Sequence, residues 1–76
     1  MKKEKHELSV EIKGRTYKGY RIVEWTSTGE MHQLIHYQMQ YSRKDIRKYK
    51  PGQEEIMESV SRLIFEDLVK EAGEVK

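Results

Sequence analysis

The first part of the chain alternates polar and apolar residues as the strands of a half-buried sheet do. Residues 7–12 alternate with a period of two, which predicts a strand with one side turned toward a core. Lys13-Gly14 predicts a two-residue hairpin turn, because glycine tolerates the positive φ that such a turn requires. A second strand is expected over residues 15–26, which are rich in aromatic and β-branched residues.

The alternation of the second strand breaks near its middle. Tyr17 occupies an odd position, whereas Tyr20 and Ile22 occupy even ones, and a glycine lies between them. We therefore predict a β-bulge at residues 18–19 that switches the face toward which side chains point. Two apolar residues would then lie on the face opposite Ile22, namely Val23 and Trp25.

Residues 31–41 are the best-patterned stretch of the chain and predict a third strand. Its odd positions are apolar or aromatic except for one glutamine, and its even positions include two histidines, so the odd side is expected to face the core. Ser42 and Asp45 resemble a helix-capping box, which predicts a short helical turn over residues 43–49. Pro51-Gly52 would end that turn.

A main helix is expected over residues 54–72. One arc of this helix is apolar and wide enough to pack on a sheet, and the first turns carry glutamates that suit the positive end of the helix dipole. The residues predicted to be most buried come from the strands and this arc: Leu8, Val10, Ile12, Ile22, Ile35, Tyr37, Met39, Ile56, Val60, Leu63 and Ile64.

These elements predict one α+β domain over residues 1–76, in which a three-stranded antiparallel meander packs against one C-terminal helix in the order βββα. Residues 1–6 are expected to be disordered. The chain has 76 residues and no cysteine, so disulfides and thiolate metal sites are excluded and a reducing, cytoplasmic location is expected. No apolar run is long enough for a signal peptide or a membrane span, and no membrane partner is expected.

An enzyme is not expected, because a core this small seldom supplies a substrate cleft. No serine lies in a glycine-flanked elbow and no glycine-rich phosphate loop occurs, so neither a catalytic residue nor a cofactor or small-molecule substrate is predicted. His32 and His36 share one side of a strand but lie about 13 Å apart along it, too far to bind one metal ion together. No metal site is predicted.

The charge is divided unevenly along the chain. Residues 1–52 hold 12 Lys or Arg against 6 Asp or Glu, whereas residues 53–76 hold 3 against 7. The basic part could contact nucleic acid or an acidic partner, although two solvated faces of opposite sign would give the same pattern. The candidate nucleic-acid contacts lie in one segment, which the first hairpin could extend: Arg43, Lys44, Arg47, Lys48, Tyr49 and Lys50.

The helix carries more apolar surface than one side of a small sheet readily covers. A second copy of the chain could cover the surplus, or the helix could lie deeper against Ile46 and Tyr49. The candidate dimer or partner surface consists of Val23, Trp25, Phe65, Val69 and Ala72. From the sequence we expect a non-catalytic protein–protein interaction module that forms a homodimer, with a small DNA- or RNA-binding protein as the alternative.

Overall fold

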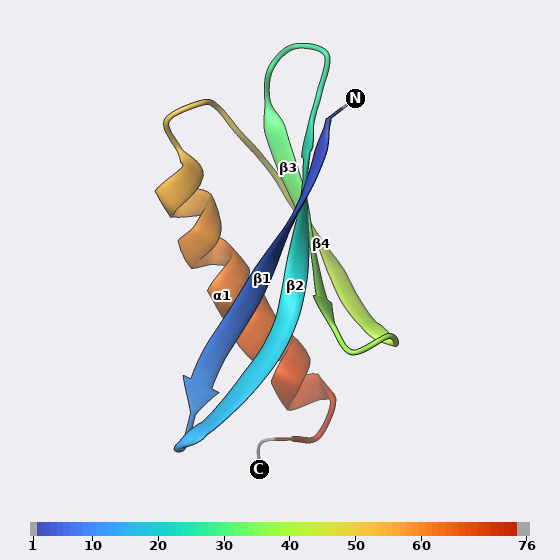
Figure 1. The fold of residues 1–76 in the computed structure, drawn as a ribbon, viewed down its shortest axis with the longest axis vertical. Coiled ribbons are helices and arrows are strands. Elements are labelled where there is room, and N and C mark those ends of the chain that lie inside the picture. The colour runs from blue at the N-terminus through green and yellow to red at the C-terminus, as the bar shows by residue number, and fades with distance from the viewer. Residues whose placement is uncertain (1, 75–76) are drawn as a thin grey trace.

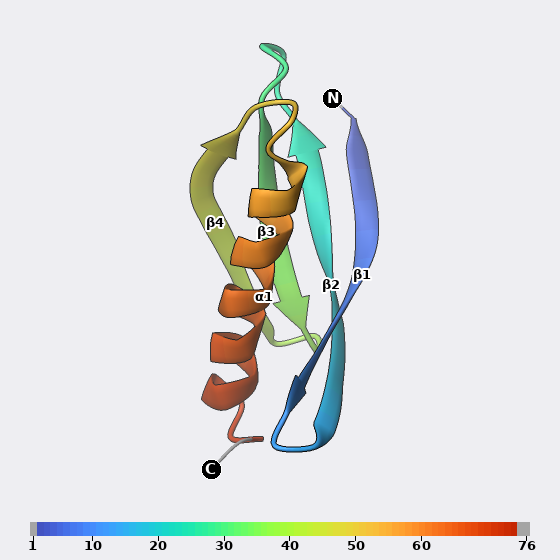
Figure 2. The ribbon, with the colours of Figure 1, turned by 90° about the vertical axis from the view of Figure 1, so that its left-hand side faces the viewer.

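The computed structural model, which describes residues 2–74, is a four-stranded antiparallel sheet with one helix packed on one of its faces (Figure 1). The elements are β1 (Lys3–Ile12), β2 (Arg15–Trp25), β3 (Met31–Tyr37), β4 (Tyr41–Tyr49) and α1 (Glu54–Glu71). The strands lie in the order β1-β2-β3-β4, so each strand pairs with the next one along the chain. Figure 2 looks onto the helix and shows β1 at one side of the sheet and β4 at the other.

The sheet is the meander that the sequence predicts, but it has four strands where three are expected. The chain turns at Gln38, which has a φ of 59°, so the predicted third strand ends at Tyr37. The helical turn predicted over residues 43–49 is wrong, because these residues belong to β4. Pairing with β3 satisfies backbone groups that a short isolated helix would leave to solvent, and this tertiary pairing overrides the local pattern.

The first hairpin has the predicted turn but not the predicted bulge. Lys13 and Gly14 both have positive φ, at 51° and 79°, as a two-residue turn of this kind requires. The pairing of β1 with β2 runs without a break from Lys3 opposite Glu24 to Ile12 opposite Arg15, so the bulge predicted at residues 18–19 is wrong. The irregularity lies in β4, where the pairing with β3 shifts between Met31 and Gln33.

Gly19 marks a close approach between elements and not a bulge. A Cβ at this position would overlap the carbonyl oxygen of His36 and the ring of Phe65. The absence of a side chain therefore allows the phenylalanine of α1 to pack directly on the backbone of β2. Because there is no bulge, Tyr17 and Val23 both face the helix, whereas Tyr20 and Ile22 lie on the other face.

The helix is predicted almost to the residue, but it turns a different side to the sheet. Its buried residues recur every three or four positions: Met57, Ser61, Phe65, Leu68 and Val69. Ile56 and Leu63, which the apolar arc places in the core, are 57% and 64% exposed. Among the other predicted core residues, Met39 lies in the β3–β4 turn and is fully exposed, while Ile12, Ile22, Val60 and Ile64 are only partly buried.

The core consists of two apolar clusters under the helix. The larger cluster contains Leu8, Val10, Tyr17, Ile35, Tyr37, Phe65, Leu68 and Val69. The smaller cluster, toward the start of the helix, contains Val23, Met31, Tyr49 and Met57. Leu8, Val10, Ile35 and Tyr37 are core residues, as predicted.

Residues 3–6, near the N-terminus, are ordered, contrary to expectation. Residues 3–6 belong to β1, so the expectation that they are disordered is wrong, and residue 1 lies outside the described residues. Within residues 2–74, no helix is long and apolar enough to cross a membrane.

Candidate functional site

A chain of buried polar groups separates the two apolar clusters. The guanidinium Nη1 of Arg21 donates a hydrogen bond to Oε1 of Gln33, at 3.2 Å. Nε2 of Gln33 donates to Oδ2 of Asp45 at 3.0 Å and to the carbonyl oxygen of Met57 at 2.9 Å. The Tyr49 hydroxyl donates to the same carboxylate oxygen at 2.5 Å. The neutral side-chain amide of Gln33 thus lies between the buried Arg21 and the buried Asp45. Its oxygen accepts a hydrogen bond from the guanidinium, and its nitrogen donates one to the carboxylate.

The electrostatics of these buried polar groups fit a structural role. Burial lowers the pKa of Arg21, an effect that the nearby Glu58 opposes. Burial raises the pKa of the Tyr49 hydroxyl, and its hydrogen bond to Asp45 raises it further. Since Gln33 bonds to β2, β4 and the helix together, its side chain fixes how these elements are aligned.

The predicted nucleic-acid segment is divided between the two faces of the sheet. Arg43 lies on the helix side, where it forms ion pairs with Glu71 at 2.8 Å and Asp67 at 3.9 Å. Tyr49 is buried in the smaller cluster, so its ring is not available to stack on a base. The remaining four residues of the segment are exposed: Lys44, Arg47, Lys48 and Lys50.

The predicted dimer surface lies mostly inside the monomer. Val23, Phe65 and Val69 are at most 1% exposed and belong to the core, so the proposal that a second copy covers them is wrong. The helix turns its Phe65 side to the sheet because Gly19 leaves room there. Trp25 and Ala72 are partly buried and pack against the core clusters.

The second face of the sheet, here called the open face, has no helix on it among the described residues (Figure 1). Antiparallel pairing places opposite residues on the same face, so the register defines a row across all four strands. One such row reads Lys5, Ile22, Leu34 and Lys44. Its two central residues are half-buried and apolar, and a lysine stands at each end.

The next row of the open face contains a pair of stacked rings. The rings of Tyr20 and His36 lie 4.7 Å apart and nearly parallel, at 13°. The Lys5 ammonium is 4.4 Å from the centre of the tyrosine ring, within the range of a cation–π contact. Nε2 of His36 is buried and has no hydrogen-bond partner among the described groups.

The β4 side of the open face has a shallow hollow of about 350 Å³. Ile46 lines it and is 90% exposed, which is unusual for a large aliphatic residue in a strand. The other lining residues are Thr26, His32, Lys44, Asp45 and Lys48. Nε2 of His32 lies 3.9 Å from a carboxylate oxygen of Glu24, and no group of three or more metal-binding side chains occurs within residues 2–74.

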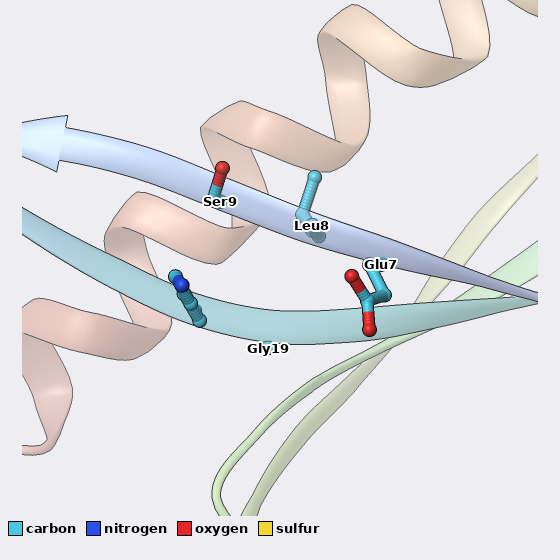
Figure 3. Close-up of a pocket in the computed structure, with 5 residues that line it drawn as sticks. Glu7, Leu8, Ser9 and Gly19 are labelled. Carbon is cyan, nitrogen blue, oxygen red and sulfur yellow. The ribbon is translucent and has the colours of Figure 1, made fainter.

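A second hollow, of about 410 Å³, lies over the first hairpin (Figure 3). Glu7, Leu8, Ser9, Lys18 and Gly19 line it. The register places Ser9 opposite Lys18 and Leu8 opposite Gly19, so the hollow spans two neighbouring pairs of the β1–β2 hairpin. Glu7 and Lys18 give its wall charges of both signs.

No protein-family model, no curated protein and no solved structure matches this chain. The candidate site therefore rests on the geometry of the open face. The sequence predicts two of its basic residues, Lys44 and Lys48, but neither Lys5 nor the face itself, because the bulge predicted in β2 placed Ile22 in the core. The alternation of residues 31–41 turns the odd side of that strand to the core and so predicts its even side, which includes Leu34, for this face.

Proposed function

We propose that this chain is a small non-catalytic interaction module that binds a partner protein through the open face of its sheet. One observation carries the proposal: Ile46 is 90% exposed on a face where Ile22 and Leu34 form a half-buried apolar centre. An apolar centre within a polar rim is the usual anatomy of a protein interface. Burying one isoleucine side chain in a partner would contribute about 1.5–3 kcal/mol.

The rim indicates the chemistry of the partner. Lys5 and Lys44 stand at the two ends of the apolar row, and Lys48 lies beside Ile46. A partner that presents apolar side chains flanked by carboxylates would match both the centre and the rim. The helix on the opposite side carries six acidic residues against two basic ones, so it would repel the same partner.

The test compares two glutamate substitutions at exposed apolar positions. Ile46→Glu changes the open face, whereas Leu63→Glu changes the solvent side of the helix, where the side chain is 64% exposed. Both variants should fold like the parent. In a quantitative capture from lysate, proteins retained by the parent and by the Leu63 variant should be lost with the Ile46 variant. Equal retention by all three would contradict the proposal.

Nucleic acid is a second candidate partner for the same face. Lysines from the hairpin and from β4 surround the Tyr20–His36 ring pair, which combines phosphate-binding charges with a stacking surface. In this case an oligonucleotide should bind with an affinity that falls steeply as salt rises. Changing Lys44 and Lys48 to Gln should abolish that binding. Changing Arg43 to Gln is the matched control, because its charge is paired with the helix.

A further inference from the structure

We propose that two copies of this chain pair through β1, antiparallel and about a two-fold axis at Leu8, so that their sheets join into one continuous sheet. This contact uses the edge of the sheet and does not depend on what the open face binds. It differs from the dimer predicted by the sequence, whose surface lies mostly inside the monomer. Three features of β1 carry the proposal.

The first feature is the difference between the two edges of the sheet. The pairing of β4 with β3 is irregular, and Pro51 follows the strand closely. Bulges, prolines and lysines are means by which proteins prevent an edge strand from pairing with another chain, and of these β1 has only the lysines, Lys3 and Lys5. β1 pairs without a break over ten residues and contains neither Pro nor Gly. Within residues 2–74, no strand lies beyond it.

The second feature is the order of charges along β1. On the open face its side chains follow the order Lys3, Lys5, Glu7, Ser9, Glu11, which is basic at the start of the strand and acidic or polar toward its end. An antiparallel copy reverses this order and can bring Lys5 of each copy against Glu11 of the other. Opposite charges across two strands stabilise the pairing. The strand is therefore complementary to itself.

The third feature selects the register. With the axis at Leu8, Lys5 lies opposite Glu11 and Glu7 lies opposite Ser9, each twice. On the helix side, Leu8 meets its own copy, so the apolar cluster that contains it would continue across the axis. An axis at Glu7 would instead place two glutamates directly opposite each other. An axis at His6 would place Glu4 against the buried Leu8 and would leave Ile12 without a partner, whereas the axis at Leu8 places Glu4 against the partly buried Ile12.

The joined sheet would have eight strands, four from each copy, and one open face. The hollow over the first hairpin (Figure 3) lies next to the proposed axis, so the dimer would place two such hollows side by side. A partner could then contact both copies, which strengthens binding through effective concentration.

The oligomeric state at tens of micromolar is the first measurement. Sedimentation equilibrium should give twice the 9.1 kDa mass of the chain, and a monomer would overturn the proposal. Lys5→Glu and Glu11→Lys should each weaken the dimer by about 10- to 100-fold, because each places like charges opposite each other twice. An equimolar mixture of the two variants should dimerise again. Lys44→Glu, which lies on β4 at the other edge of the sheet, is the control and should leave the dimer unchanged.

Cross-linking tests the register. The chain has no cysteine, so introduced thiols are the only ones present. Glu7→Cys mixed with Ser9→Cys should form a disulfide between the two variants, because the proposed axis places these positions opposite each other. A faster disulfide between two copies of the Glu7 variant would overturn the register. Charge variants that remain dimeric without any preference in the mixture would overturn the β1 contact.

Discussion

The substitution Gly19→Ala tests how the helix docks on the sheet. The added methyl group would overlap a backbone oxygen, that of His36, and the ring of Phe65. The φ of Gly19 is not among the positive values, so the alanine backbone is unstrained and the cost is steric. Alanine in a strand gains about 0.5–1 kcal/mol over glycine, whereas overpacking of a core costs about 1–3 kcal/mol and sometimes more.

The overpacking term should exceed the gain, because the backbone oxygen cannot rotate away as the end of a flexible side chain could. Because two contacts would be shorter than 3.0 Å, the overpacking cost should lie near about 2–3 kcal/mol. After the gain is subtracted, we expect a net loss of about 1–2.5 kcal/mol from a total stability of roughly 4–11 kcal/mol for a chain of this length. At about 4–8 °C per kcal/mol, the melting temperature should fall by roughly 5–20 °C. Thermal unfolding followed by circular dichroism measures this change directly.

Two controls separate the steric cause from others. Gly29→Ala adds a methyl group where no atom lies within 4 Å, at a φ of +83°, so its cost is conformational and should amount to about 1 kcal/mol. Phe65→Leu removes part of the ring that the new methyl group would meet. The effects of Gly19→Ala and Phe65→Leu on the free energy of unfolding should therefore be coupled by about 0.5–3 kcal/mol in a double-mutant cycle. A Gly19→Ala variant as stable as the parent would refute the proposed docking.

Two more predictions concern the helix and the buried phenols. Met57→Ala should lower the free energy of unfolding by about 2–5 kcal/mol, because the Met57 side chain is 2% exposed, whereas Leu63→Ala should lower it by less than about 0.5 kcal/mol. Urea unfolding measures both losses. The reverse ranking would mean that the helix turns its other side to the sheet. Burial raises the pKa of Tyr37 and Tyr49 in the folded state. The free energy of unfolding that these neutral phenols contribute is therefore fully present below the pKa of an unfolded tyrosine, about 10, and is lost as the pH rises through the folded pKa. Urea unfolding between about pH 8 and 11 should show this decline, and Tyr49→Phe should make it shallower.

Much of the topology could be predicted because local signals marked it. The hairpin turn at residues 13–14 has a glycine where positive φ is needed, and the helix has a long apolar periodicity. The turn at Gln38 has no such signal, since neither glycine nor proline occurs there and the alternation continues through it. β4 is also hard to recognise as a strand from the sequence, because it is rich in charged residues and one of its two buried residues is Asp45.

The side of the helix that faces the core could not be predicted from periodicity alone. Its apolar residues surround more than half of the helix, so two orientations are compatible with the pattern. The structure selects one through contacts between distant residues. Phe65 needs the space left by Gly19, and the carbonyl oxygen of Met57 accepts a hydrogen bond from Gln33. Neither contact is visible in the sequence of the helix itself.

The order of the strands has a consequence for synthesis of the chain. Since each strand pairs with its predecessor, the sheet can form step by step as the chain leaves the ribosome, without waiting for a distant segment. The helix follows all four strands along the chain, and until it emerges the apolar side that contains Leu8 and Ile35 lacks the helix that covers it. A nascent chain that stalls before residue 54 would therefore expose the whole core side of a finished sheet, together with an unprotected β1 edge. The interval before the helix docks is thus the stage of biosynthesis at which aggregation should be most favourable.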